Sequence, residues 1–413
     1  MGSSRNTATP LRVQRADVLA FRWSAQGLDR APGGAASVAD VPVLDLGVQD
    51  TGPDGARWAL ELRGVHAPGP GDLPDDVALA WTLRGAPHAY RRSDLPAVAV
   101  ATAPLSEADA AKRVISASGP LRAAGISVLD ALRTMAEHER ALVTSPTVKG
   151  ELSTRLTERL PEAYVRWCAP CGATHSYEMT FRLAALQAGL EIEDGTSPPV
   201  LRPVPGLEPP LYGRLADQAD PRHDVVRGYL RFLGPASVHN VAAFLDAPVR
   251  TVRDAWPADV VEVEVEGMGG SGGKGPSGRG GGRPARSLWV LADDADALAG
   301  AAGRHREQAH GTTQLRLAGP YDPFLQLRDR ELLVREQARR TDLWRTLGRP
   351  GAVLADGEVV GTWRPRASSG RLAVLVDPWQ RWDQALTDAV AEQAERLGSF
   401  RDASSVSVER ASA

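Results

Sequence analysis

Apolar residues recur at helical spacing in a region that ends in alternating, strand-like residues. Three segments there each place their apolar side chains on one helical face: residues 126–139, 147–160 and 176–190. A hairpin is predicted next, from residue 190 to about residue 204. Three helices followed by a hairpin, the wing, is the layout of a winged helix, a DNA-binding fold.

The same plan recurs further along the chain. Three short helices are predicted at residues 225–233, 237–245 and 249–256, with Ser237 as an N-cap. The strands of a second hairpin follow at residues 260–265 and 287–291. Between these strands, residues 267–286 are mostly Gly and Ser but include four cations: Lys274, Arg279, Arg283 and Arg286. A cationic tip suits the DNA backbone, because Lys and Arg release condensed counterions on binding; a solvated linker is the alternative interpretation.

The two ends of the chain differ from these repeats. Near the N-terminus, helices are predicted at residues 13–27 and 54–63, with a strand-like run within residues 78–90. The C-terminal part is rich in strands, and Asp356-Gly357 between two apolar runs predicts a tight hairpin. These strands favour a small barrel or curled sheet, closed by a helix over residues 382–397 and followed by an unstructured tail.

We therefore predict an α+β protein with tandem winged-helix (helix-turn-helix) domains and a small β-barrel-like domain at the C-terminus. The expected domains are an N-terminal winged-helix-like domain with the candidate catalytic motif, a second winged helix, a third with the Gly/Arg-rich wing, and the β-rich domain with its closing helix. Their respective boundaries are residues 11–105, 106–206, 207–300 and 301–413.

The composition and charge of the chain exclude some classes of protein but do not identify the function. The 413 residues carry a net charge of −3, so a surface for nucleic acid has to be local. No apolar run is long enough to span a membrane, and residues 1–10 lack the apolar core of a signal peptide. We therefore expect a cytoplasmic protein.

The chain has two cysteines, Cys168 and Cys171, which are too few for a disulfide scaffold. With His175 they give three zinc ligands, whereas structural zinc sites usually have four. A redox dithiol requires a strand-to-helix setting, which the predicted helix–helix junction does not offer. Two thiols packed at the head of a helix are the third interpretation. No metal and no other cofactor is predicted.

Several short segments carry a resemblance that extends over residues 11–397. They are residues 46–51, 83–88 with Asp94, 149–152, 229–236, 320–324 with 328–330, 356–357 and 361–364. In order and spacing they resemble the AlkZ/YcaQ-like family of bacterial DNA glycosylases, proteins with tandem winged helices and a β-barrel. The resemblance implies hydrolysis of the N-glycosidic bond of bulky or N7-alkylated purines.

The family uses a Gln-x-Gln or Gln-x-Asp motif, and the resemblance matches it to Gln49-Asp50-Thr51. Spacing i, i+2 puts Gln49 and Thr51 on one side of an extended segment, where they can hold a water. Thr51 departs from the motif, because a hydroxyl hydrogen-bonds a water but does not accept its proton at neutral pH. Three interpretations stay open. A register shift, or a turn enforced by Gly52-Pro53, brings Asp50 to the reacting water; another acid, such as Asp45 or Asp54, serves instead; or the protein binds DNA without cleaving a bond.

Candidate DNA contacts come from three places. Through the resemblance, Arg84 and His88 match an Arg-Gly-Thr-x-His segment near the damaged nucleotide, although bracing of a hairpin explains them equally well. Arg250 and Arg253 lie one turn apart in the predicted recognition helix of the third domain, where a solvated face is the alternative. The third place is the wing, with Lys274, Arg279, Arg283 and Arg286.

These observations leave two main functions. A cytoplasmic, nucleoid-associated glycosylase would bind damaged double-stranded DNA and excise alkylated purines with Gln49 and either Thr51 or Asp50. A non-catalytic DNA-binding protein, for damage recognition or transcriptional regulation, is the alternative, and a protein–protein scaffold is a weaker third. No coiled coil is evident, which favours recognition of damage over reading of an operator. No membrane and no obligate protein partner is expected.

Overall fold

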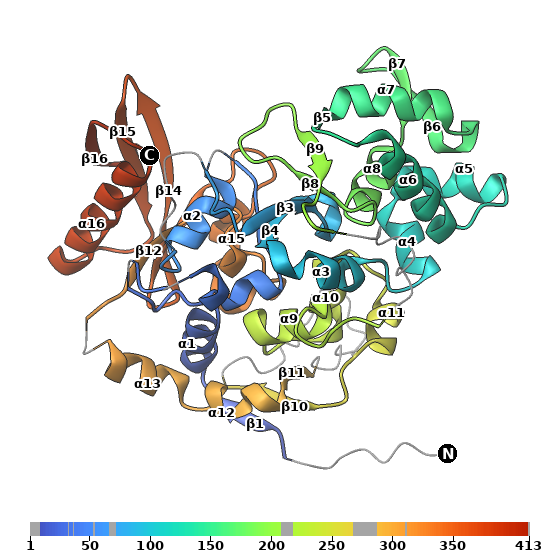
Figure 1. Cartoon of the computed structure of the whole chain (residues 1–413). Coiled ribbons are helices and arrows are strands. Elements are labelled where there is room, and N and C mark those ends of the chain that lie inside the picture. Colours follow the sequence, from blue (N-terminus) through green and yellow to red (C-terminus); the bar gives the residue numbers. More distant parts are fainter. Residues whose placement is uncertain are drawn as a thin grey trace, which may run out of the picture.

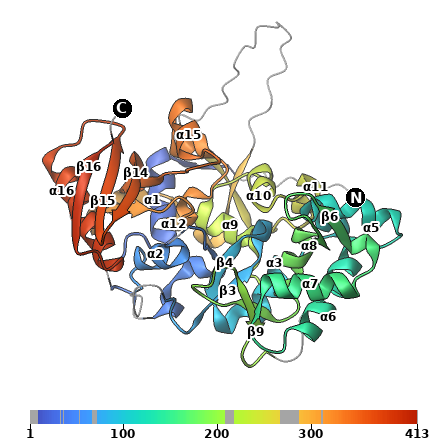
Figure 2. The same ribbon diagram turned by 90° about the horizontal axis from the view of Figure 1, so that it is seen from above.

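Four β-sheets and the helices between them make up the described part of the chain. The computed structural model describes residues 9–31, 33–35, 37–52, 54–65, 72–207, 218–266, 287–309 and 312–411. The C-terminal sheet lies at one end of an elongated molecule, and the helices of residues 107–185 lie at the other (Figures 1 and 2). Among the described helices, none combines the length and the apolar composition needed to cross a bilayer.

The largest sheet joins strands that are far apart in the sequence. Neighbouring strands are antiparallel, and their order is β2 (Val48–Gln49), β4 (Pro87–Arg91), β3 (Val77–Trp81), β8 (Leu190–Ile192), β9 (Val200–Pro203) and β5 (Thr147–Val148). Leu79 of β3 pairs with Ile192 of β8, so this sheet crosses the boundary predicted near residue 105. Every residue of β3 is buried, which explains its continuous apolar run.

The helices predicted for residues 126–190 form close to their expected positions. They are α6 (Val128–Leu142), α7 (Lys149–Arg159) and α8 (Glu178–Ala185), preceded by α3 (Leu95–Thr102), α4 (Glu107–Arg113) and α5 (Ser118–Ala123). The predicted hairpin after them is confirmed as β8 and β9. The predicted direct junction between the last two helices is wrong, because the hairpin of β6 (Val165–Cys168) and β7 (Ala173–Ser176) intervenes.

The second set of three helices and a hairpin is also present. It consists of α9 (Val225–Leu233), α10 (Val238–Leu245), α11 (Val249–Asp254), β10 (Val260–Val265) and β11 (Leu288–Leu291). Ser237 caps α10 as predicted, because its side chain accepts a hydrogen bond from the Asn240 N–H. Strand β1 (Leu11–Val13) adds to this hairpin in parallel with β10. The wing tip, with Lys274, Arg279, Arg283 and Arg286, lies outside the described residues.

The C-terminal strands form an open sheet, whereas a barrel-like domain was one expectation. Their order is β12 (Leu315–Ala318), β13 (Gly351–Ala355), β14 (Glu358–Ser368), β15 (Arg371–Pro378) and β16 (Ser405–Arg410). Asp356 and Gly357 both have positive φ, 50° and 83°, which confirms the predicted tight turn. Helix α16 (Gln384–Phe400) closes the domain as expected. The prediction of an unstructured tail is wrong, because β16 pairs in parallel with β15.

Helices from the N-terminal segment attach the C-terminal part to the rest of the molecule. Helix α1 (Arg15–Ala25) carries Arg22, whose buried guanidinium lies 2.6 Å from the Asp329 carboxylate. Just after α2 (Gly55–Glu61), Arg63 donates two 2.9 Å hydrogen bonds to Asp322, and both side chains are fully buried. Paired, hydrogen-bonded buried charges of this kind fix the relative position of the segments that carry them.

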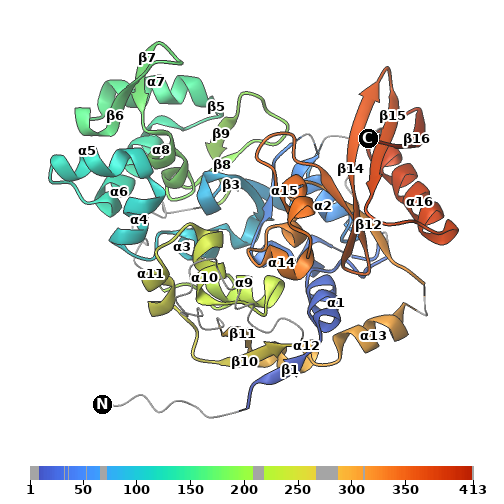
Figure 3. The same cartoon turned by 180° about the vertical axis from the view of Figure 1, so that it is seen from behind.

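Short helices complete the C-terminal part. They are α12 (Ala295–Leu298), α13 (Ala301–Gln308), α14 (Arg330–Leu333) and α15 (Gln337–Leu343). Seen from behind, α14 and α15 lie between α9 and the C-terminal sheet (Figure 3). The segment of residues 319–330 contacts the N-terminal part, because Asp322 pairs with Arg63 and Asp329 pairs with Arg22.

Candidate functional site at the end of strand β2

Gln49 and Thr51 lie on the same side of the chain, as the spacing predicts. Gln49 pairs with His88 across strands β2 and β4, and its Nε2 donates a 3.0 Å hydrogen bond to Thr51 Oγ1. Because Thr51 accepts this bond, its own hydroxyl hydrogen stays available for another acceptor. The two side chains therefore form one polar unit with an unused donor.

Asp50 faces elsewhere and caps helix α2. Its Oδ1 accepts a 2.8 Å hydrogen bond from the Ala56 N–H, and its own N–H donates to the Pro87 carbonyl at 2.8 Å. Burial raises the pKa of the Asp50 carboxyl, while the bond from Ala56 opposes that rise. A Cβ on Gly55 would lie 1.9 Å from Asp50 Oδ1, so this cap requires glycine there. The structure thus does not bring Asp50 together with Gln49 and Thr51.

The two other candidate acids are both engaged with arginines. Asp45 lies 2.5 Å from Arg91 and 3.1 Å from Arg222. Asp54 is paired with Arg401, which donates to it at 3.0 Å. Of these two acids, only Asp54 lines a cavity that Thr51 also lines.

Arg84 holds the Gln49 carboxamide in place. Its Nη2 lies 3.3 Å from Gln49 Oε1, and its Nη1 donates to the Phe244 carbonyl at 2.6 Å. The guanidinium also lies over the Phe244 ring, 5.0 Å from its centroid. Burial, reinforced by the nearby cation of Arg328, lowers the pKa of Arg84 to about 10, so the group stays charged at neutral pH. Arg84 has a φ of 57°, an uncommon conformation for a residue with a side chain.

His88 is buried and uncharged. Burial and the cation of Arg84 lower the pKa of His88 to about 3. Its Nδ1 lies 2.9 Å from the Ala86 carbonyl oxygen, which can only accept, so Nδ1 carries the hydrogen and Nε2 has the free lone pair. His88 can therefore accept a hydrogen bond, but it offers no positive charge for a phosphate.

Two cavities adjoin the Gln49–Thr51 pair. The smaller, of about 10 Å³, is lined by Gln49, Arg84, His88 and Gln326, and the buried Gln326 Nε2 has no hydrogen-bond partner. Such a space is about the size that one water needs, and four polar side chains surround it.

The larger cavity, about 210 Å³, is lined by Thr51, Asp54 and the aromatic side chains of Trp58, Tyr321 and Trp363. The indole N–H of Trp58 donates to the Leu317 carbonyl at 2.7 Å. The indole N–H of Trp363 likewise donates to the Ala318 carbonyl, at 2.9 Å. With these polar groups satisfied, the indole rings offer apolar surface to the cavity, and such surface suits a flat aromatic group.

A cluster of arginines lies beside this site. Arg328, Arg330 and Arg349 are each partly buried, and burial is the main cause that lowers the pKa of all three. Arg328 and Arg349 are also close enough to lower the pKa of Arg84. Arg349 lines the larger cavity and stacks on Tyr321, 4.8 Å from the ring centroid. A group of closely spaced positive charges is a suitable surface for binding phosphate groups.

Sequence reasoning missed this cluster. The run Arg328-Asp329-Arg330 alternates in charge, but Asp329 is buried against Arg22, so its charge is already paired. The signal available in the sequence was the position of Arg328 and Arg330, shortly after the segment at residues 320–324. The role of Gln326 had no such signal.

Arg250 and Arg253, the predicted contacts of the third domain's recognition helix, are not part of this cluster. Arg250 and Arg253 are exposed on α11, and the Arg250 side chain is 91% exposed with Asp254 at 4.0 Å. They do not line either cavity. The four wing cations lie outside the described residues.

The segment that carries this site lies within a matched family model. The model described as DNA glycosylase AlkZ-like matches residues 43–400. The chain belongs to the AlkZ-like DNA glycosylase family. This match spans Gln49, Arg84 and the arginine cluster alike.

A solved structure supports the fold of this AlkZ-like chain. The Streptomyces sahachiroi DNA glycosylase AlkZ aligns with a TM-score of 0.63 and 19% sequence identity, covering 97% of this chain and 100% of that one. A search of curated proteins gave no match. At this identity the structural likeness establishes a shared fold.

Proposed function

We propose that this AlkZ-like protein is a DNA-repair glycosylase that hydrolyses the N-glycosidic bond of N7-alkylated or bulky-adduct purines in duplex DNA. The observation that carries the proposal is the Gln49–Thr51 pair, oriented by Arg84 beside a cavity of one-water size. Gln49 and Thr51 are the groups that hold the attacking water. His88, uncharged and with a free Nε2, is a hydrogen-bond acceptor for that water.

The chemistry needs little acid assistance. An N7-alkylated purine is already cationic, so when the bond from C1′ to the base breaks, the electron pair neutralises the leaving base. The water oxygen then bonds to C1′ of the oxocarbenium-like sugar, and its proton passes to solvent. Since that sugar is strongly electrophilic, a positioned neutral water is a sufficient nucleophile, and the absence of a carboxylate at Thr51 is compatible with catalysis.

The larger cavity supports the choice of a modified purine. Its aromatic walls at Trp58, Tyr321 and Trp363 suit a displaced base or an aromatic adduct, and Thr51 also lines it. Access to C1′ of a nucleotide in duplex DNA requires that nucleotide to leave the stack, and a preformed aromatic cavity lowers the cost of doing so.

DNA binding then comes from two kinds of surface. The arginine cluster of Arg328, Arg330 and Arg349 would bind the phosphates that flank the lesion, together with Arg84. We interpret the two sets of three helices and a hairpin as winged helices, with Arg250, Arg253 and the wing cations on more distant phosphates. Phosphates also offset the cationic charge that would otherwise oppose a positive sugar. We place this activity at the nucleoid.

Base release is the test of this proposal. A duplex with one N7-methylguanine is incubated with the protein, and the free base is quantified by mass spectrometry alongside an unmodified duplex. Release is expected from the modified duplex only, and it should be lost in Gln49→Ala while DNA binding is retained. No release above the Gln49→Ala level, with binding intact, would contradict the proposal.

A second candidate is lesion binding without excision. It is favoured by the position of Asp50, which caps α2, and by the ion pair that occupies Asp54. This candidate predicts tighter binding to modified than to unmodified duplex, with no free base in the same assay.

A further inference from the structure

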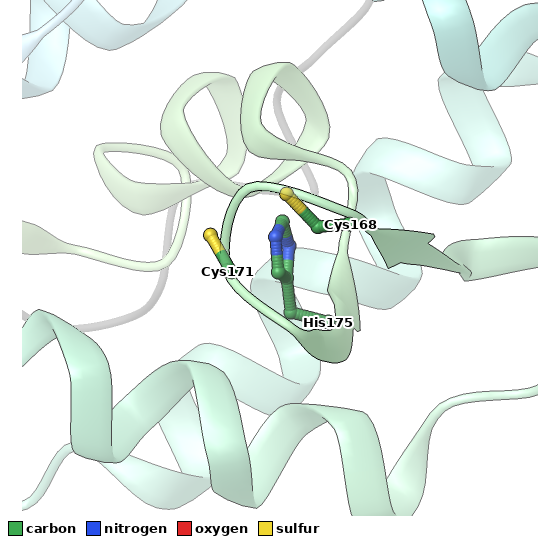
Figure 4. A group of neighbouring side chains, drawn as sticks. All are labelled: Cys168, Cys171 and His175. Atoms are coloured by element: carbon green, nitrogen blue, oxygen red, sulfur yellow. The ribbon is translucent and has the colours of Figure 1, made fainter.

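The β6–β7 hairpin carries a cluster of metal-ligating side chains that the proposed activity does not use. The Sγ atoms of Cys168 and Cys171 and a ring nitrogen of His175 lie within 4.8 Å of one another. His175 extends from β7 toward the turn that bears both cysteines (Figure 4). The hairpin lies at the end of the molecule opposite the C-terminal sheet (Figures 1 and 3).

The backbone of the turn brings the two thiols to one side. The Cys171 N–H donates to the Cys168 carbonyl at 3.2 Å, and Gly172 follows with a φ of 61°, a conformation that favours glycine. Cys168 is half-buried and Cys171 is exposed, so the thiols do not pack in the core. The expectation of two thiols packed at the head of a helix is therefore wrong. They sit on the tip of a hairpin, which also lacks the strand-to-helix setting of a redox dithiol.

His175 is oriented as a metal ligand. Its Nδ1 lies 2.7 Å from the Ser176 carbonyl oxygen, which can only accept a hydrogen bond. Nδ1 therefore carries the hydrogen, and Nε2 keeps the lone pair. Metal-binding histidines commonly have this arrangement, in which a carbonyl fixes the tautomer and the ring.

The β6–β7 hairpin is not part of a larger sheet, although β7 packs against α7. Strands β6 and β7 have four residues each and pair with no other described strand, and Trp167 on β6 is 65% exposed. A two-stranded hairpin is at best marginally stable by itself. A metal that joins the turn to β7 would hold the exposed tip of the hairpin in one conformation.

We propose that Cys168, Cys171 and His175 bind Zn²⁺, with water as the fourth ligand, and that the ion stabilises the β6–β7 hairpin. Two thiolates and an imidazole are the donor set that zinc prefers, and together they neutralise its charge. Zn–S bonds of 2.3 Å in a tetrahedral site place two sulfurs about 3.8 Å apart, so small side-chain rotations suffice. Glu178, an acid whose charge acts on Cys171, is already hydrogen-bonded to Lys149 at 2.8 Å and Arg182 at 2.6 Å.

The second cluster of possible ligands among the described residues lacks this character. Asp45, Asp94 and His223 lie close together, but Arg91 contacts both carboxylates, at 2.5 and 3.2 Å. An arginine therefore already supplies the positive charge at that position.

Metal analysis of the purified full chain tests the proposal. We expect one zinc per chain from cultures supplied with zinc, and background levels in Cys168→Ser, Cys171→Ser and His175→Gln. His138→Gln, which alters a histidine on α6 outside the cluster, is the matched control and should retain the zinc. Cobalt substitution adds a specific signature, because the chain has only two cysteines and a thiolate-to-cobalt absorption band can arise only from them.

Because the variants can fail to fold, a second measurement uses the unaltered protein. Titration with a mercurial should release zinc in step with modification of two thiols, and it should lower the melting temperature. The protein is purified in the presence of a reductant. The proposal is overturned if the zinc-supplied protein has no bound metal, if Cys168 and Cys171 form a disulfide in it, or if the Cys168→Ser, Cys171→Ser double variant keeps its zinc. This test is independent of base release.

Discussion

Arg84 Nη2 lies 3.3 Å from Gln49 Oε1, so a buried cation determines which end of the carboxamide faces Thr51. The amide oxygen must face the guanidinium, which can only donate, and the amide N–H₂ then faces the Thr51 hydroxyl. Arg84 is in turn fixed by the Phe244 carbonyl on α10. A helix of the third predicted domain thereby positions a residue of the N-terminal one.

This relationship predicts that Arg84→Lys impairs catalysis more than DNA binding. A lysine keeps the charge but cannot hold both the Gln49 and the Phe244 oxygens in the fork geometry of a guanidinium. We expect the rate of base release to fall by about 10- to 100-fold from misplacement of Gln49.

Binding at several salt concentrations separates the two roles of Arg84. Arg84→Ala should reduce the slope of log affinity against log salt by about 0.9, the value for one lost phosphate contact, while Arg84→Lys should leave it unchanged. Arg306→Ala, at an exposed position on α13, is the control. An Arg84→Lys protein as active as the wild type would contradict the role given to this residue.

Asp50 is expected to matter for stability and not for the reaction. Asp50→Asn keeps the Oδ1 acceptor for the Ala56 N–H, so it should release base at the wild-type rate. Asp50→Ala loses the cap of α2 and should lower the free energy of unfolding by about 1 kcal/mol. Thermal unfolding and base release are measured on both variants. A folded but inactive Asp50→Asn protein would show that Asp50 takes part in catalysis.

His88 should produce no inflection in the pH dependence of the reaction. Burial and the Arg84 cation lower its pKa to about 3, so its charge does not change between pH 5 and 8. Titration of His88 should therefore cause no change in the single-turnover rate of base release between pH 5 and 8. The check is a pH profile of wild type and His88→Gln. An inflection near neutral pH that disappears in His88→Gln would mean that His88 titrates during the reaction.

Glu139 on α6 offers a test of stability against pH. Both of its carboxyl oxygens are buried without a hydrogen-bond partner, and burial raises its pKa well above the usual value. The folded state therefore retains a proton that the unfolded state loses above pH 4.5. Stability should fall as pH rises from there toward the raised pKa, by up to about 1.4 kcal/mol per pH unit.

Glu139→Gln removes that titration. The variant should match the wild type near pH 4 and become progressively more stable than it toward neutral pH, as followed by chemical unfolding. Glu137→Gln, at an exposed position of the same helix, provides the comparison and should change the profile little. A wild-type advantage that grows with pH would show that Glu139 is ionised and stabilising.

Local patterns predicted the elements well. The helix periods, the Ser237 cap and the Asp356-Gly357 turn all depend on residues close in sequence, and the structure has each of them. The i, i+2 spacing also placed Gln49 and Thr51 together, because the segment leaves β2 in an extended conformation. Strand β16 escaped prediction because its pairing with β15 is a long-range contact.

The parts of the site that the sequence did not predict also depend on long-range contacts. Arg84 contacts Phe244, which is 160 positions away in the sequence. Arg22 pairs with Asp329, which is 307 positions away. No local pattern encodes such contacts. Asp50 illustrates the converse: an acid beside a catalytic motif suggested chemistry, but the start of α2 uses it as a hydrogen-bond acceptor.

The most direct test of the account is the single-turnover rate of N7-methylguanine release at saturating enzyme, for wild type, Gln49→Ala, Thr51→Val and Thr51→Ser. If Gln49 and Thr51 hold the attacking water, Gln49→Ala should slow release by about 100-fold or more at unchanged Kd, as expected for loss of a positioned hydrogen-bonding group. Thr51→Val should also be slow, while Thr51→Ser, which keeps the hydroxyl, should approach the wild-type rate. Equal rates in all four proteins would contradict the account.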